Sequence, residues 1–191
     1  LTIEQIDIYA SPKYSPAQMS LIRFSIKYNY NLKDIDLFIK QPFTEKQFKL
    51  ISYGVRDNLN IEDIKFYAKI NYSDKQIEQL YESFKAGLKQ DLISLYSDPQ
   101  NDAIDMECHR LSFSYNIPLI EIKELFNTDV FDESQLDIIR SGFQNKFEFK
   151  LIQIYANPKF NSLQMEEIFS AILLELPLEQ IKIIANYKFD S

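Results

Sequence analysis

Residues 155–168 read YANPKFNSLQMEEI, and residues 9–22 read YASPKYSPAQMSLI, a near copy. A weaker form of this pattern recurs along the 191 residues, in which an isoleucine returns at almost constant spacing. The recurring residues are Ile6, Ile35, Ile64, Ile93, Ile122, Ile152 and Ile181, separated by 29, 29, 29, 29, 30 and 29 positions. The extra residue falls between Phe126 and Phe131, in an expected loop. A fixed period of this length indicates a repeat protein.

Each repeat is expected to contain two helices, of which the second is longer and begins at a capping box. In a capping box, the N-cap side chain and a glutamine three residues later each accept a hydrogen bond from the other's backbone N–H. The pairs are Ser15/Gln18, Thr44/Gln47, Ser73/Gln76, Asp132/Gln135 and Asn161/Gln164. An aromatic residue precedes each cap at hydrophobic-staple spacing from the fourth helical residue, as with Phe43 and Phe48. Pro16 suits the first helical position, where its missing N–H costs nothing.

The long helices are expected to end at Asn29, Asn58, Gly87 and Asn116, residue types that tolerate the left-handed conformation of a C-cap. Lys146 and Glu175 occupy this place later, so those two helices are expected to end differently, with Pro177 stopping the second. A column of small residues should let the next helix approach each long helix closely. It consists of Ser25, Gly54, Ser83, Ser112, Gly142 and Ala171.

The shorter helix, as in residues 32–39, is apolar at too many positions for a surface helix with one buried face. We therefore expect it to be sandwiched between neighbours. Asn31 and Asn60 are its expected N-caps. The fourth repeat departs from the pattern at three positions, where Lys89 replaces the cap, Gln90 an apolar residue and Asn101 the staple aromatic. A kink or weak packing is expected between Lys89 and Asp105.

The fold class that follows is all-α. It is an α-solenoid of about six 29-residue two-helix repeats plus a terminal half repeat, within a single domain over residues 1–191. The expected units are residues 1–31, 32–60, 61–89, 90–118, 119–148, 149–177 and the half unit 178–191. A lone helical hairpin buries too little apolar surface to fold, so the units must stack. The staple and cap of a seventh long helix should begin at Phe189 and Asp190. The sequence is therefore expected to be an excerpt, or to have ends that another chain or self-association covers.

The pattern Y-A-x-P-x-F-x-x-x-Q-M-x-x-I resembles degenerate helical repeats in proteins of Firmicutes mobile elements. Residues 9–22 and 155–168 carry the resemblance most closely, whereas the intermediate repeats share spacing more than residues. The Gly-Leu pair that the resemblance leads us to expect after the long helix occurs at Gly87-Leu88 alone. The resemblance implies a helical-repeat fold over the whole chain and a bacterial source. It implies no catalytic activity.

Composition bears on several functional classes. The formal net charge of −7 opposes binding to a phosphate backbone. With Cys108 as the single cysteine, an internal disulfide is excluded, and a reducing, cytoplasmic location fits. No apolar run approaches the roughly 20 residues of a membrane span. Glycine-rich phosphate loops, nucleophile elbows and H-E-x-x-H motifs are absent, so we expect neither an enzyme nor a cofactor.

The only histidine, His109, stands in the core column that holds Ile22 and Ile51 in other repeats. The favoured interpretation is a partly buried side chain with a local hydrogen bond. The alternative is a metal site with nearby acids, although the segment lacks the glycine and ligand spacing of a calcium loop. Those acids are Asp98, Asp102, Asp105 and Glu107.

One face of the long helices differs from repeat to repeat. Apolar and aromatic side chains occupy it in some repeats, whereas Gln79 and Glu82 occupy it in the third. One interpretation is that the fold, or parts of the protein outside this sequence, bury the face in some units. The other is that a protein or peptide partner docks on its aromatic anchors. The predicted partner-binding residues are Leu21, Phe24, Tyr28, Leu50, Tyr53, Leu111 and Tyr115. The expected function is thus a non-catalytic protein–protein interaction scaffold or adaptor, and the alternative is a nucleic-acid-associated repeat module.

The long helices carry two columns of cationic residues, one that borders the core stripe and another close by. They are Arg23, Arg110 and Arg140, and Lys27, Arg56 and Lys85. One interpretation is a basic strip for phosphates or acidic peptides. The other, which we favour, is a solvated flank paired with neighbouring acids such as Asp137, which contributes little to stability.

Overall fold

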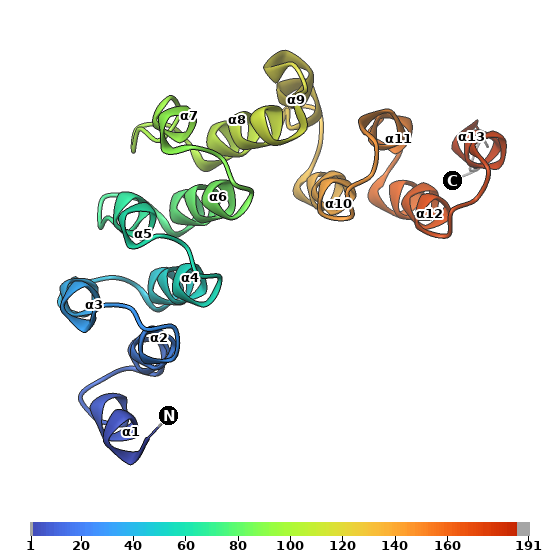
Figure 1. Ribbon diagram of the computed structural model, residues 1–191. Coiled ribbons are helices and arrows are strands. Elements are labelled where there is room, and N and C mark those ends of the chain that lie inside the picture. Colours follow the sequence, from blue (N-terminus) through green and yellow to red (C-terminus); the bar gives the residue numbers. More distant parts are fainter. Residues whose placement is uncertain (1, 187–191) are drawn as a thin grey trace. The chain divides into compact units, whose positions relative to one another are not determined.

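The computed structural model describes residues 2–186 and places them in α-helices joined by loops, with no strand in that range (Figure 1). This confirms the all-α class. The expected seventh cap, at Phe189 and Asp190, lies outside the described residues. The helices are α1 (Ile3–Tyr9), α2 (Pro16–Lys27), α3 (Leu32–Ile39), α4 (Glu45–Arg56), α5 (Ile61–Tyr67), α6 (Asp74–Lys85), α7 (Gln90–Ser94), α8 (Ala103–Tyr115), α9 (Leu119–Leu125), α10 (Glu133–Gln144), α11 (Phe149–Tyr155), α12 (Ser162–Leu173) and α13 (Leu178–Asn186).

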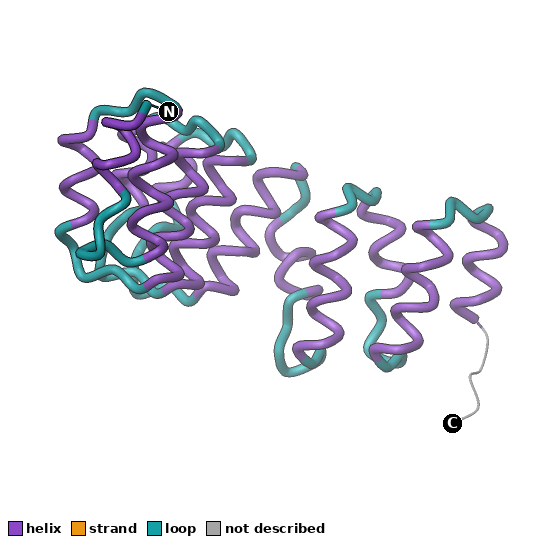
Figure 2. Tube along the Cα trace, turned by 90° about the horizontal axis from the view of Figure 1, so that it is seen from below, coloured by secondary structure: helices purple, strands orange, loops and turns teal. Residues whose placement is uncertain are grey.

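The chain forms two compact units, Leu1–Leu119 and Ile120–Ser191, which divide at the start of α9. Within each unit the long helices lie in one layer and the short helices in another (Figure 1). In the first unit α2, α4, α6 and α8 pack side by side in chain order, and in the second α10 packs on α12. The loops gather at the two ends of the helices (Figure 2). A single domain over residues 1–191 stays a prediction.

The capping boxes place the helix starts where the sequence predicts them, and all five are present. At α4, the Thr44 N–H donates to Gln47 Oε1 over 2.9 Å, and the Gln47 N–H donates to Thr44 Oγ1 over 3.1 Å. The staple residues Phe43 and Phe48 pack edge to face, with ring centroids 5.6 Å apart. A further box, Thr2 with Gln5, opens α1. Sequence reasoning missed it because α1 is a short helix, and short helices were expected to use asparagine caps.

The long helices end in left-handed residues throughout the described chain. Those predicted are Asn29, Asn58, Asn116 and Gly87, with φ of 59°, 58°, 53° and 80°. The expectation that Lys146 and Glu175 end their helices differently is wrong, since their φ values are 58° and 55°. In both cases the next residue closes a Schellman bond to the last turn, as where the Phe147 N–H donates to the Gly142 oxygen over 3.0 Å. This bond offsets a left-handed strain of roughly 1–2 kcal/mol.

The capping glutamines also connect one repeat to the next. Gln47 Nε2 donates to the Tyr72 carbonyl over 3.0 Å, and Gln135 Nε2 donates to the Phe160 carbonyl over 2.7 Å. Gln76 Nε2 donates to two carbonyls of the following loop, at 3.0 and 2.6 Å. These three amides are buried, and each has both its acceptor and its donor satisfied. Each of these glutamines therefore has two roles, since it caps its own helix and also fixes the loop that precedes the next long helix.

At its two glycines, the small-residue column receives a tyrosine from the following short helix. A Cβ atom placed on Gly54 would lie 2.0 Å from Tyr67 Oη, and one on Gly142 would lie 1.9 Å from Tyr155 Oη. Both tyrosines are fully buried. Tyr67 Oη donates to the Leu50 carbonyl over 3.4 Å, and Tyr155 Oη donates to the Ile138 carbonyl, also over 3.4 Å. Close approach was predicted for this column, and the tyrosine ring is what approaches.

In two repeats that have serine in this column, the serine hydroxyl itself donates to the equivalent carbonyl. Ser25 Oγ donates to the Leu21 carbonyl over 2.7 Å, and Ser83 Oγ donates to the Gln79 carbonyl over 2.6 Å. Tyr96 Oη then donates to Ser83 Oγ over 2.8 Å. Glycine or serine in this column is thus matched to the side chain packed on it.

Helix α3 has one buried face, so the expectation that it is sandwiched between neighbours is wrong. Ile35 and Phe38 are buried, whereas Leu32 and Leu37 are 38% and 57% exposed. The reason is the two-layer arrangement, in which a short helix packs against long helices on one side only (Figure 1). The asparagine caps themselves are confirmed, since Asn31 Oδ1 accepts from Lys33 and Asn60 Oδ1 from Glu62.

The short helix of the fourth repeat, α7, spans five residues, and Lys89 provides no side-chain cap. The expected kink or weak packing between Lys89 and Asp105 stays a prediction. Ile93 is nevertheless fully buried. Because a missing cap costs about 1 kcal/mol, we expect amide protons of α7 to exchange roughly fivefold faster than those of α5. Native-state hydrogen exchange at single-residue resolution measures this. Equal protection of α7 and α5 would contradict it.

Candidate functional site

The predicted partner-binding residues divide into buried and accessible ones. Leu21, Leu50 and Leu111 are 0%, 5% and 2% exposed, so their placement on an open face is wrong. Phe24 and Tyr28 are half-buried, and Tyr53 and Tyr115 are each 37% exposed. Since α6 lies between α4 and α8, Tyr115 is separated from the aromatic residues of α2 and α4. The predicted residues that are not buried and that lie on the neighbouring helices α2 and α4 are Phe24, Tyr28 and Tyr53.

The face varies between repeats because much of it lies between neighbouring long helices. Gln79 Oε1 on α6 accepts from Arg110 Nε on α8 over 3.0 Å. One repeat earlier, Asp57 at the end of α4 accepts from Tyr81 Oη on α6 over 2.5 Å. The two contacts join different polar groups, an amide with a guanidinium and a carboxylate with a phenol. The face therefore need not be apolar in every unit. The sequence pattern did not reveal these pairs, because each joins residues more than twenty positions apart on neighbouring long helices.

The group around Asp57 is electrostatically neutralised. Burial raises the pKa of the Asp57 carboxyl, but hydrogen bonds from Arg56 and Tyr81 outweigh burial and hold the pKa below its ordinary value. Burial and the Asp57 carboxylate together raise the pKa of Tyr81 well above its ordinary value. At neutral pH the carboxylate is therefore charged and the phenol protonated, which suits the hydrogen bond that joins them.

Cations lie over the aromatic rings of this region. Arg23 is 5.0 Å from the Phe24 ring centroid, Lys27 is 5.2 Å from Tyr28, and Arg56 is 4.6 Å from Tyr53. Such contacts contribute about 0.5–1 kcal/mol at exposed sites. We call the surface formed by Arg23, Phe24, Lys27, Tyr28, Lys49, Tyr53 and Arg56 the α2–α4 surface.

The two predicted cationic columns are mostly ion-paired flanks, as favoured. Arg140 lies 2.8 Å from Asp137 and 3.2 Å from Glu133, and Lys85 lies 3.3 Å from Glu82. Arg23 and Lys27 differ, since no ion pair to either is present within residues 2–186. Their charge is exposed to solvent beside aromatic rings.

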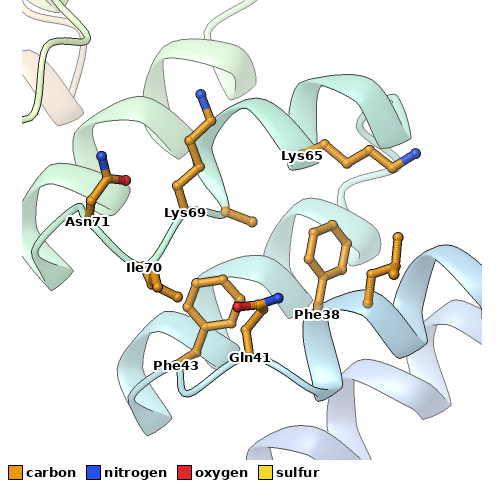
Figure 3. Close-up of a pocket in the computed structure, with 9 residues that line it drawn as sticks. Phe38, Gln41, Phe43, Lys65, Lys69, Ile70 and Asn71 are labelled. Atoms are coloured by element: carbon orange, nitrogen blue, oxygen red, sulfur yellow. The ribbon is translucent and has the colours of Figure 1, made fainter.

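An open cavity of about 380 Å³ lies between the ends of α3 and α5 (Figure 3). Its lining residues are Leu37, Phe38, Gln41, Phe43, Lys65, Ala68, Lys69, Ile70 and Asn71. Hydrogen bonds to Asp34 and Glu62 raise the pKa of Lys65, so this amine stays protonated and is a poor nucleophile. The lining holds no carboxylate, histidine or cysteine, so the cavity offers apolar contact and amide hydrogen bonds but no acid–base pair.

His109 packs partly buried in the core, as predicted. Its ring stacks on Tyr96 with centroids 5.5 Å apart and an interplanar angle of 7°. Asp105, one of the acids of the alternative metal site, has its Oδ2 3.6 Å from His109 Nε2, beyond ordinary hydrogen-bond length. Over residues 2–186, no three histidine, cysteine or acidic side chains converge as a metal ion would require.

Comparison of the chain with protein-family models, with curated proteins and with solved structures finds no match. None of the described helices has both the length and the apolar character that crossing a membrane requires.

Proposed function

We propose that this chain is a non-catalytic protein–protein interaction scaffold or adaptor, built as an α-solenoid of about six two-helix repeats plus a half repeat. The observation that carries the proposal is the aromatic surface that α2 and α4 leave accessible. Phe24 and Tyr53 occupy equivalent positions one repeat apart, and folding does not fully bury either ring. Aromatic side chains beside arginine are the residue types that dominate binding energy at protein interfaces.

Two features support the solenoid arrangement. Capping boxes open five of the long helices and left-handed helix ends recur in both units, so most repeats share the same local structure. Gln47, Gln76 and Gln135 each connect one repeat to the next by an equivalent hydrogen bond, to the carbonyls of Tyr72, Asn101 and Phe160. Stacked repeats with a regular connection present an extended surface, which is how solenoid proteins bind partners.

A nucleic-acid-associated module is the second candidate, favoured by the cations that lie over the aromatic rings of α2 and α4. Single strands bind to cationic grooves with aromatic stacking platforms. The net charge of −7 argues against it. This candidate predicts tight binding of an oligonucleotide that weakens steeply as salt rises.

The double substitution Phe24→Ser with Tyr53→Ser tests the scaffold function. We expect it to abolish capture of the partner while lowering the free energy of unfolding by only about 1–2 kcal/mol, because both rings are partly exposed. Affinity purification from the source organism, then a binding measurement with the purified partner, gives the first readout, and thermal unfolding gives the second.

The control is Leu21→Ala, which should cost about 2–5 kcal/mol because Leu21 is fully buried. Equal capture by the wild type and the Phe24/Tyr53 variant would refute the assigned surface. A loss of stability as large as that of Leu21→Ala would show that the two rings belong to the hydrophobic core.

A cytoplasmic location, self-association through the end repeats and kinship with mobile-element repeat proteins stay predictions. The accessible leucine and isoleucine side chains of α1, α12 and α13 are compatible with self-association, among them Ile3, Leu174 and Ile183 at 76%, 73% and 60% exposure. Sedimentation velocity over a range of concentrations measures the oligomeric state.

A further inference from the structure

We infer that the α2–α4 surface binds an acidic peptide segment, whose carboxylates meet Arg23, Lys27 and Lys49 and whose apolar side chains pack on Phe24 and Tyr53. The inference rests on the proposed scaffold function and adds the chemistry of the partner.

Local charge is the first argument. The sequence of α2 holds two cationic residues and no acidic one, and that of α4 holds three cationic residues and one acidic. The next long helix, α6, reverses the balance with two cationic and three acidic residues. The whole chain has 21 Lys and Arg against 28 Asp and Glu. Two adjacent helices thus carry a positive surface within an acidic protein, and a positive surface attracts an acidic partner.

The availability of these cations is the second argument. On α4, Lys46 is paired with Glu78 at 2.8 Å and Arg56 with Asp57 at 2.9 Å. Arg23, Lys27 and Lys49 are exposed and have no ion pair in the described part of the chain. A bound carboxylate would not have to displace an existing acid from them.

The repeat geometry brings these groups onto one surface. Lys49, Tyr53 and Arg56 follow one another at i, i+4 and i+7 and so share a face of α4. Phe24 is equivalent to Tyr53, and Lys27 is equivalent to Arg56, one 29-residue repeat earlier. Because α2 and α4 pack side by side, aromatic and cationic groups alternate across two neighbouring helices. Such alternation fits a segment in which acidic and apolar residues are interspersed.

A peptide fits this surface better than a nucleic acid. The neighbouring α6 carries Glu78 and Glu82, so a polyanion that continued past α4 would meet carboxylates. Within the α2–α4 surface, only Arg23, Lys27 and Lys49 have no ion pair among the described residues, whereas the salt-dependent binding of nucleic acids usually draws on more phosphate contacts. A short acidic segment bound on α2 and α4 ends before it reaches α6, where the surface charge changes from positive to negative.

Selection from a display library of random short peptides on the full chain tests the inference. We expect the selected peptides to be enriched in Asp and Glu interspersed with aromatic or aliphatic residues. The double charge reversal Arg23→Glu with Lys27→Glu should weaken binding of a selected peptide about tenfold or more, since two favourable charge contacts become repulsive. Fluorescence anisotropy with the labelled peptide measures this loss.

The matched control is Lys33→Glu with Lys89→Glu, which changes the net charge equally but lies at the short helices α3 and α7, away from this surface. It should bind like the wild type. Equal weakening by both pairs would show an effect of net charge alone and overturn the site. Selected peptides without acidic enrichment would overturn the acidic partner while leaving the scaffold function standing.

The remaining outcomes are equally distinct. If the wild type selects no peptide, the proposed function itself fails for peptide partners. If an oligothymidylate binds more tightly than any selected peptide and the Arg23/Lys27 reversal abolishes its binding, the partner is a nucleic acid and the inference is wrong. Circular dichroism spectra confirm that each variant remains helical.

Discussion

Replacing Gly54 with Ala lowers the free energy of unfolding by about 2 kcal/mol, although alanine is the better helix former. The new Cβ would lie 2.0 Å from Tyr67 Oη, and the tyrosine is fully buried with no space to retreat. Chemical denaturation of the full chain measures the loss. The same substitution at Gly142 should behave alike, because its Cβ would lie 1.9 Å from Tyr155 Oη.

The variant that combines Gly54→Ala with Tyr67→Phe provides the control. Removing the hydroxyl leaves Ile64 Cγ1 and Tyr67 Cζ as nearest neighbours, both at 3.3 Å, which small shifts can accommodate. We expect the double variant to be no less stable than Tyr67→Phe alone, so the two substitutions are coupled by about 2 kcal/mol. Additive effects would contradict the close contact as the cause. The chain already contains a comparable combination, since Ser25 stands in the small column of the repeat whose corresponding short-helix residue is Phe38.

Replacing Gln47 with Glu costs about 2–3 kcal/mol at neutral pH, because a carboxylate keeps the capping box but cannot donate to the Tyr72 carbonyl. The charge would be buried beside that carbonyl oxygen, since Gln47 is 6% exposed. Burial raises the pKa of such a carboxyl in the folded state above the unfolded value near 4.3, so the native state binds the proton more strongly. The deficit should therefore shrink as pH falls toward about 4.

The matched control is Gln5→Glu, at the exposed capping box of α1. Its cost should stay within about 0.5 kcal/mol, because the site is solvated and a negative charge suits a helix start. Urea titrations at several pH values measure both variants. A Gln47→Glu deficit that is equal to that of Gln5→Glu, or independent of pH, would show that the bridging hydrogen bond contributes little.

Part of the candidate site could be predicted from sequence and part could not. Of the predicted aromatic residues, Tyr53 is exposed and Phe24 and Tyr28 are half-buried, and their role in partner binding stays a prediction. Leu21 and Leu50 were assigned to the same surface wrongly, since i, i+3 and i+7 spacing places residues on one side of a helix but does not say where the neighbouring helix covers it. The free cations Arg23 and Lys27 could be told from paired ones such as Arg140 only by their distances to acids.

The sequence by itself predicted where five of the long helices begin, because caps and staples are local interactions between residues a few positions apart. The period of 29 residues likewise followed from spacing alone. Only the tertiary structure decided what each repeated position contacts in the next repeat. It showed that Gln47 ties one repeat to the next, that Gly54 makes room for Tyr67, and that Leu21 is buried. These contacts join residues more than ten positions apart, and their energies depend on distances that exist only after the helices have packed.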